Sequence, residues 1–350
     1  HQGFVGVLDK KLQEEKYDAI QKNQQFSYDA NSGWFGFGDK YWLSALAFID
    51  EKGTAQASFS EKAENKMYTL SYRSHMISVP AHQSITEKTY FFAGPKDLDL
   101  LDAYQETLGI ERFELAIDFG WYYFLTKPFL RLLSWLYGLV GNMGIAILIF
   151  ATALRLLMLP IASQSFESMA KMRKVQPRIQ ELQKRYKDDK VRLNQELLLL
   201  YKQEKISPAA GCLPMFIQIP VFFSLYKVLS VSIEMRQAPF FGWIHDLSAR
   251  DPSSVLTVFG LLPWPIPSML NIGVWPVLMG ITMYLQQKMS APATGNNQSS
   301  DMASAMRWMP LIFTFMMGNF ASGLVIYWTW SNILGIIQQR YIMHKYEVKK

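Results

Sequence analysis

One apolar stretch with a single charge inside it most constrains how this chain can fold. Residues Met143 to Ala162 read MGIAILIFATALRLLMLPIA and carry one charge, Arg155. About 20 apolar residues are long enough to cross the roughly 30 Å hydrocarbon core of a bilayer as a helix. An arginine near the centre of such a helix costs about 2.5–3.5 kcal/mol on insertion scales, so it usually faces water or a partner. We therefore expect Arg155 to face a wet cavity inside the membrane. The alternative is an arginine whose long stem reaches the headgroups.

Charge divides the chain into two unlike parts. Residues 1–120 contain 18 acidic and 12 basic residues, whereas residues 121–350 contain 11 acidic and 23 basic residues. The basic residues of the second part cluster in short loops beside apolar runs, which fits the positive-inside rule better than a base-reading surface. We therefore expect an acidic domain outside the membrane, a C-terminus on the inner side, and no sequence-specific nucleic-acid partner.

Residues 1–120 have the pattern of a β-rich domain. Aromatic or alternating runs such as Trp34–Gly38 and Met67–Tyr72 are separated by turn residues. They predict part of a β-sandwich-like domain that is followed by a helix over about Asp97–Gly109. The sequence starts at His1 with no signal or anchor before a domain expected outside, so we expect a signal or transmembrane helix upstream.

The second part is expected to be α-helical. An amphipathic helix on the membrane surface is predicted over residues 121–141, with Pro128 in its first turn. Basic residues flank the last apolar run on both sides, so we expect it to form two short helices that turn near residues 318–323. The prediction is a five-helix α-helical transmembrane core, with spans at about residues 143–162, 213–233, 272–289, 306–318 and 319–340.

Residues 163–210 are charged and lie between two expected spans. They contain eleven Lys or Arg and six Asp or Glu, with apolar residues at helical spacing in two stripes, Met172–Leu182 and Leu193–Tyr201. Two helices with such stripes and a tight polar turn between them predict an αα-hairpin. We expect this helical hairpin on the cytoplasmic side.

The sequence offers no groups for bond chemistry within the expected spans. All five histidines and every Asp and Glu lie outside them, and Cys212 is the only cysteine. Proton relays and intramembrane proteases need such groups. We therefore expect no enzyme, no catalytic residue, no metal and no cofactor. An unpaired Arg155 in low dielectric would attract acidic groups of a polypeptide. The alternative is a small-anion transporter or channel that uses Arg155 as its binding site.

Three stretches of the sequence resemble the YidC-type membrane protein insertases. They begin GNMGIAILIF at Gly141, LLLLYKQEKI at Leu197 and SGLVIYWTWS at Ser322, and the resemblance covers essentially the whole chain. It implies a multi-pass bacterial inner-membrane insertase and chaperone. Residues 1–120 would be the later part of its periplasmic domain, and a first transmembrane helix would lie upstream.

The resemblance also implies roles for single residues and partners. Arg155 matches the arginine of a hydrophilic groove that attracts acidic residues in a client's tail, and Gln218 would add polarity to that groove. A hydrophobic slide for the client's emerging helix is matched by Phe222, Met316, Tyr327 and Trp328. The implied partners are nascent membrane proteins, the ribosome, the Sec translocon and the lipid bilayer. The chain differs from some relatives in Ala151 and in the longer loop over Ser253–Asn271.

Overall fold

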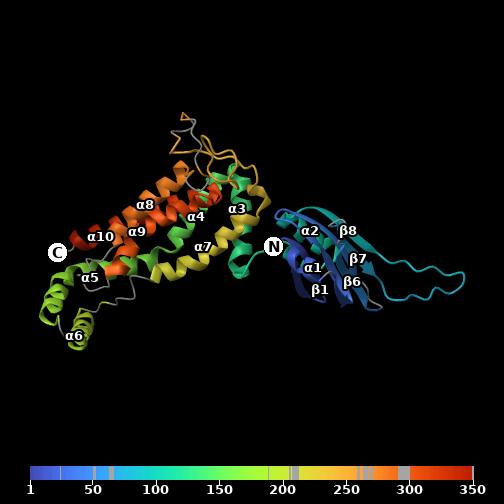
Figure 1. Cartoon of the computed structure of the whole chain (residues 1–350), viewed down its shortest axis with the longest axis horizontal. Coiled ribbons are helices and arrows are strands. Elements are labelled where there is room, and N and C mark those ends of the chain that lie inside the picture. Colours follow the sequence, from blue (N-terminus) through green and yellow to red (C-terminus); the bar gives the residue numbers. More distant parts are fainter. Residues whose placement is uncertain are drawn as a thin grey trace. The chain divides into compact units, whose positions relative to one another are not determined.

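The computed structural model describes most of the 350 residues in two compact units (Figure 1). The described ranges are 1–23, 25–49, 53–62, 67–187, 189–204, 206, 213–257, 261–262, 267, 271–290 and 300–348. The first unit is His1–Lys127 with Val231–Glu234, and the second is Pro128–Ser230 with Met235–Lys350.

In the first unit, the described strands form two antiparallel sheets. The five-stranded sheet has the order β2-β1-β4-β5-β8, and the three-stranded sheet has the order β3-β6-β7. The strands are β1 (Gly3–Leu8), β2 (Lys11–Lys16), β3 (Gln25–Ala30), β4 (Ser32–Gly38), β5 (Trp42–Ile49), β6 (Ala55–Lys62), β7 (Met67–Arg73) and β8 (Thr89–Pro95). The prediction of a β-rich N-terminal domain is confirmed.

Aromatic side chains pack the two sheets face to face. Phe4 of β1 stacks on Phe59 of β6 with ring centroids 3.7 Å apart, and both side chains are buried. On the other face of β4, Trp34 meets Phe113 edge to face at 5.2 Å. Phe113 begins the short 3₁₀ helix η1 (Phe113–Ala116), so the five-stranded sheet is covered on both faces. This explains why all six residues of β1 are buried.

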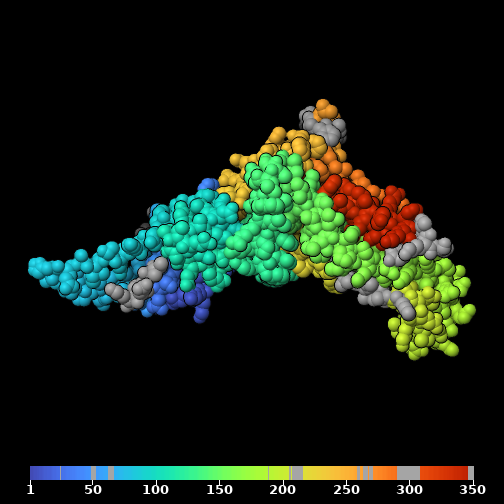
Figure 2. Space-filling view, turned by 180° about the vertical axis from the view of Figure 1, so that it is seen from behind, coloured from blue at the N-terminus to red at the C-terminus, as the bar shows by residue number. Residues whose placement is uncertain are grey.

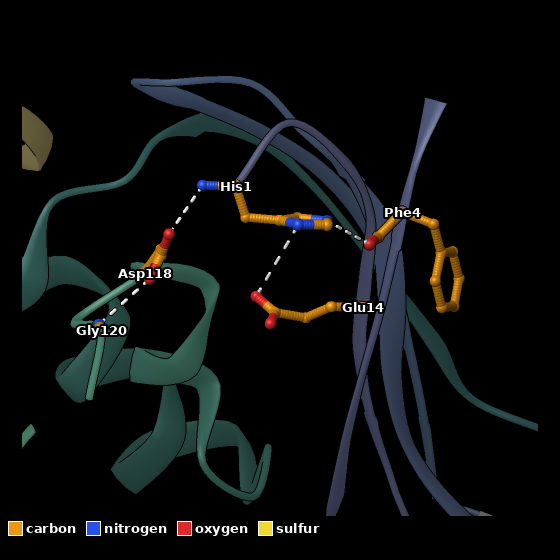
Figure 3. A network of polar contacts seen from close by, with 5 residues as sticks. All are labelled: His1, Phe4, Glu14, Asp118 and Gly120. Atoms are coloured by element: carbon orange, nitrogen blue, oxygen red, sulfur yellow. Dashed lines mark hydrogen bonds and ion pairs between the residues drawn. The ribbon is translucent and has the colours of Figure 1, made fainter. Parts of the chain in front are cut away.

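Polar contacts tie the beginning of β1 to the segment that follows η1 (Figure 3). The backbone nitrogen of His1 lies 2.7 Å from Asp118 Oδ2, and Asp118 Oδ1 accepts a hydrogen bond from the Gly120 amide. The His1 ring nitrogen Nε2 lies 2.7 Å from the Phe4 carbonyl oxygen, and Nδ1 lies 4.0 Å from Glu14 Oε1.

The helix predicted over Asp97–Gly109 is α2 (Leu98–Leu108). Asp97 Oδ1 accepts a hydrogen bond from the Leu100 amide at 2.9 Å, which satisfies one of the free N–H groups of the first turn. Gly109, at φ 70°, ends the helix in the left-handed conformation that glycine adopts without steric cost. A shorter helix, α1 (Tyr17–Asn23), follows β2 and buries Ile20.

The second unit is built from helices. Apart from α3 (Tyr123–Val140), which begins in the first unit, the described ones are α4 (Met143–Leu157), α5 (Leu159–Arg185), α6 (Lys190–Gln203), α7 (Leu213–Val231), α8 (Val274–Ser290), α9 (Ser300–Met317) and α10 (Ser322–Val348). No single described helix has both the length and the hydropathy of a membrane span, whereas the bent pair α4 and α5 has them when taken together. The five predicted spans therefore stay a prediction.

Pro128 does not lie in the first turn of α3, which corrects the sequence-based expectation. The helix begins five residues earlier, at Tyr123, and the amides of Leu125 and Thr126 both bond the Tyr122 carbonyl. Proline inside a helix removes one backbone hydrogen bond. Here the tightened first turn supplies enough local bonding to start the helix before the proline.

The stretch over residues 143–162 is not one straight helix. It breaks at Met158, and α4 and α5 are bent by 61° relative to each other. Pro160 is the cause, because it lacks the N–H that would bond the Leu156 carbonyl one turn earlier. Helix α5 then continues without interruption through Arg185, so its first turn belongs to the expected span and its remainder to the expected hairpin.

The two apolar stripes of residues 163–210 meet in one small core. Val175 and Ile179 of α5 pack against Leu200 of α6, and Asp189 caps α6 by accepting from the Arg192 amide. Residues 188, 205 and 207–210 of the expected hairpin lie outside the described residues. Helix α10 lies along α5 (Figure 2). Phe166 of α5 and Ile342 of α10 are buried together where the two helices meet.

Helices α9 and α10 meet at a short turn over residues 318–321, inside the segment where the sequence favoured one. The Gly318 amide bonds the Thr314 carbonyl, and the Phe320 amide bonds the Met317 carbonyl. Helix α9 starts at Ser300 rather than near residue 306, so the helix is longer than the apolar run alone suggests.

Candidate functional site

Arg155 lies in the last turn of α4 and reaches across to α10. Its Nη2 atom occupies the space that a Cβ on Gly335 would fill, and Gln286 Nε2 of α8 lies 2.9 Å from the same point. The Nε atom of Arg155 is buried and has no hydrogen-bond partner among the described residues. No described Asp or Glu forms an ion pair with it, and the ionisable side chain that acts on it is Tyr327. Arg155 is thus a cation between three helices that lacks a carboxylate there.

Two more predicted site residues lie in the same polar cluster. Gln218 Nε2 of α7 donates a hydrogen bond to Tyr327 Oη of α10 at 3.3 Å. Tyr327 is 2% exposed, hydrogen-bonds Ser331 and interacts electrostatically with Arg155. The structure therefore brings Arg155, Gln218 and Tyr327 together from three helices, although the resemblance had assigned Tyr327 to the hydrophobic slide.

Further polar side chains between these helices were missed in the sequence. Trp330 Nε1 donates to Thr152 Oγ1 at 2.9 Å, and Asn332 Nδ2 donates to Thr282 Oγ1 at 3.3 Å. Ser224 is fully buried, and its hydroxyl has no partner among the described residues. The sequence held a signal for the cluster around Arg155 but not for these side chains, because Tyr327, Ser331, Gly335 and Gln338 recur every three or four residues on one side of α10.

The apolar candidates lie in a cluster of their own. The rings of Phe222 and Trp328 meet edge to face at 4.6 Å, and Phe313 lies 4.9 Å from Trp328. Both rings pack against a buried core that includes Met317. Met316 is instead 46% exposed. The structure therefore joins Phe222 to Trp328 and leaves the neighbouring Met316 on the surface.

Arg155 also borders a cavity of about 450 Å³ between the α4–α5 bend and α10. Most of its lining is apolar, with Leu156, Leu159 and Ile337 among the side chains. No group of three or more described His, Cys, Asp or Glu residues is placed to hold a metal ion. The arrangement is suited to binding a ligand or a polypeptide segment, because it offers a cation, amide groups and hydroxyl groups beside apolar side chains.

Comparisons with known proteins cover both parts of the chain. A profile of the family described as 60Kd inner membrane protein matches residues 135–350, and a profile of the YidC periplasmic domain matches residues 1–132. The curated membrane protein insertase YidC of Rickettsia conorii is 48% identical over 346 residues, which are 98% of this chain and 61% of that protein. The insertase of Rickettsia prowazekii gives the same identity and coverage. The chain thus spans about three fifths of the length of these relatives.

One solved structure, an active YidC insertase crystal structure with the first transmembrane domain resolved, is similar to 96% of this chain and 82% of that chain. The TM-score is 0.47 and the sequence identity is 18%. This score is too low to establish a common fold by itself.

Proposed function

Because this chain belongs to the YidC family of inner-membrane insertases, we propose that it inserts inner-membrane proteins and helps them fold, with no covalent chemistry. One observation carries the proposal. Arg155 is a cation held between helices beside the hydrogen-bonded pair Gln218 and Tyr327, and its buried Nε has no partner in the part of the chain that the structure describes. Such a site can bind a polar or acidic segment of a polypeptide for a short time.

The physical role of Arg155 is electrostatic. A charge in a low-dielectric environment attracts an opposite charge more strongly than it does in water. An acidic residue in the translocated tail of a client would gain a partner at Arg155 and so cross the apolar layer at a lower cost. Because Gln218 and Tyr327 carry no charge, they would offer hydrogen bonds to the tail without trapping it.

The apolar part of the client needs a different surface. Phe222 and Trp328 form an aromatic pair, and Met316 is an exposed flexible side chain next to Met317, whose buried side chain belongs to the core against which both rings pack. Methionine adapts to varied shapes, so a surface of this kind suits many different hydrophobic segments. We assign to these residues the contact with the emerging transmembrane helix.

Charge and family membership support a proposed topology and a set of partners. The basic excess after residue 121 favours residues 1–120 in the periplasm and the C-terminus in the cytoplasm. The α5–α6 pair would then face the cytoplasm. Its exposed Val191 and Leu198 offer apolar surface for nascent clients at the ribosome, and the Sec translocon is a further expected partner. The proposed placement has five membrane spans, and each contains one of the helices α4, α7, α8, α9 and α10.

Site-directed photocrosslinking tests the proposal. A photoreactive amino acid replaces Phe222, Met316 or Trp328 during synthesis of a single-span protein with an acidic tail. We expect strong crosslinks from these positions to the nascent span. A matched probe at Trp42, an exposed aromatic of the β domain, should give none.

Silence from all three positions, with the protein folded and ribosomes engaged, would contradict chain handling. The same protein in liposomes would then be tested for anion flux, with an Arg155→Gln variant as its control. Flux that depends on Arg155 would support the small-anion transporter in place of the insertase.

A further inference from the structure

The cavity beside Arg155 has the size and lining of a ligand site. Its volume of about 450 Å³ falls in the range of roughly 300–1,000 Å³ typical of small-molecule pockets, which are mostly apolar with a few placed polar groups. The lining residues are Thr152, Arg155, Leu156, Leu159, Ser163, Leu334, Ile337, Gln338, Tyr341, Ile342 and Lys345. Among the described lining residues, Arg155 and Lys345 are basic and none is acidic, so the cavity suits a ligand that is apolar and negatively charged.

Gln338 places a side-chain amide with unsatisfied hydrogen-bonding groups in the lining of the cavity. Its side chain is 9% exposed, and both its Nε2 and its Oε1 atoms lack a partner among the described residues. Burying an unsatisfied amide costs free energy, and most such groups in proteins find a partner. The two other short polar side chains of the lining are already bonded, because Ser163 donates to the Leu159 carbonyl and Thr152 donates to the Leu148 carbonyl. Gln338 is therefore the group that a ligand would satisfy.

The two basic side chains of the lining, Arg155 and Lys345, lie at different heights along the axis of α10. Arg155 touches α10 at Gly335, and Lys345 lies ten residues further on, which is about 15 Å along a helix. The Arg155 guanidinium is turned toward Gln286 of α8, which is not part of the cavity, so its alkyl stem is available to the cavity wall. Lys345 is exposed and lies at the end of α10 that we place on the cytoplasmic side. Gln338 lies seven residues before Lys345 on α10, which is about 10 Å along the helix axis. A ligand with its anionic group at Lys345 would therefore reach Gln338 with its middle part and the apolar lining residues with the rest.

We propose that this cavity binds one anionic glycerophospholipid of the inner leaflet. The phosphate lies at Lys345, and the glycerol ester region lies at Gln338, whose Nε2 donates to an ester carbonyl. One acyl chain runs along Leu156, Leu159 and Ile337, three side chains that are 42–63% exposed without a ligand. The lipid would fill the elbow that Pro160 creates between α4 and α5. The proposal rests on the membrane placement given above but not on insertase activity, because its test measures bound lipid.

Native mass spectrometry of the full-length protein, released from detergent micelles with added phosphatidylglycerol, tests the site. We expect one tightly retained lipid per protein. Ile337→Trp fills the cavity and should lower retention about tenfold, and Lys345→Ala should do the same through loss of a charge-assisted contact. Ile312→Trp is the matched control, because Ile312 is similarly exposed (65%, against 60% for Ile337) but lies on α9 away from the cavity. It should leave retention unchanged.

Gln338→Leu separates binding from folding. It removes two polar atoms that have no partner among the residues the structure describes, so the thermal stability of the lipid-free protein should be equal or higher while lipid retention falls. Equal retention in the Ile337→Trp and Ile312→Trp variants would overturn the proposal. Retention of phosphatidylcholine as strong as that of phosphatidylglycerol would overturn the requirement for an anionic headgroup. Displacement of the lipid by excess inorganic phosphate would show a site for a free anion instead.

Discussion

Arg155 of α4 places its Nη2 atom in the space where a side chain at position 335 of α10 would begin, and Gly335 leaves that space open. This contact fixes where the only charge of the apolar 143–162 stretch stands relative to α8 and α10. A cation held in this way reaches the polar cluster around Tyr327, whereas a longer side chain at position 335 would force it elsewhere.

We therefore expect Gly335→Ala to displace the Arg155 guanidinium. Alanine favours helix by about 1 kcal/mol relative to glycine, so the thermal stability of the protein should not fall. Insertion of a client with an acidic tail should nevertheless slow about fivefold, which corresponds to roughly 1 kcal/mol of lost interaction. The measurement is the rate of insertion into proteoliposomes. Gly138→Ala on α3 is the control, because its new Cβ would meet nothing within 4 Å. Equal rates for both variants would contradict the positioning role of Gly335.

Substitutions of Arg155 itself test the electrostatic mechanism. We expect Arg155→Ala to reduce insertion of clients with acidic tails about tenfold, as the loss of one charge-assisted interaction would, and clients with neutral tails much less. Arg155→Lys should be tolerated better, because it keeps the positive charge. Insertion of paired clients that differ only in one tail residue gives the measurement, with Arg340→Ala as a variant that removes an exposed charge outside the cluster. Equal losses for acidic and neutral tails would be incompatible with attraction by charge.

Asp251, a residue that sequence reasoning did not single out, holds the long loop after α7 to the start of α8. Its carboxylate is 5% exposed; Oδ1 accepts from Trp243 Nε1, the Ser253 amide and the Ser253 hydroxyl, and Oδ2 accepts from the Trp275 amide. Asp251→Asn turns one acceptor into a donor that faces a backbone N–H. We expect it to destabilise the helical unit by about 3 kcal/mol, since buried donors are left unpaired. Thermal unfolding in detergent checks this.

The matched control for that variant is Asp246→Asn in the same loop. Asp246 accepts three hydrogen bonds from Gln237 and Ser248, all through Oδ1. The asparagine carbonyl can keep these bonds, so its loss of stability should be smaller. A midpoint for Asp251→Asn that equals that of Asp246→Asn would show that the Trp275 contact contributes little.

The sequence predicted those parts of the molecule that depend on local patterns. Turn residues and aromatic alternation indicated the β domain, and Asp97 and Gly109 indicated both ends of α2. Apolar spacing indicated the two stripes that meet around Val175 and Leu200. The break at Met158 was not predicted. Pro160, which causes it, was visible in the sequence, but the long apolar run favoured one continuous span over residues 143–162.

Contacts between distant residues were beyond such reasoning. Gln218 and Tyr327 are 109 positions apart, and their hydrogen bond exists only because α7 lies against α10. Ser253, which donates two of the hydrogen bonds to Asp251, is only two residues away, but the Trp275 amide belongs to the first turn of α8, 24 positions further on, so nothing near Asp251 in the sequence indicates that contact. Met316 was assigned by resemblance, and its exposure depends on the packing of α9, which turns the adjacent Met317 into the core.

Lys96 offers a test of the β domain that is independent of membrane insertion. The side chain is 5% exposed, and burial lowers its pKa to about 8, against the opposing influence of Asp118, Asp39 and Glu14. Its usual value in an unfolded chain is 10.5. Between these two pH values the unfolded state binds more protons than the folded state, so stability should rise with pH from about 8 to 10.5 and stay at its lower level below pH 8.

Lys96→Met should remove this dependence. The shift corresponds to about 3 kcal/mol of burial cost for the charged amine, so the variant should raise the unfolding temperature of the β domain at pH 7 and flatten its pH profile above pH 8. Calorimetry of the detergent-solubilised protein at pH 7, 8.5 and 10 measures both effects. Lys40→Met is the control, because Lys40 is exposed in the turn between β4 and β5. A Lys96→Met protein that is less stable than the wild type at pH 7 would contradict this expectation. It would show that the attraction between the lysine charge and the neighbouring carboxylates exceeds the cost of burying that charge.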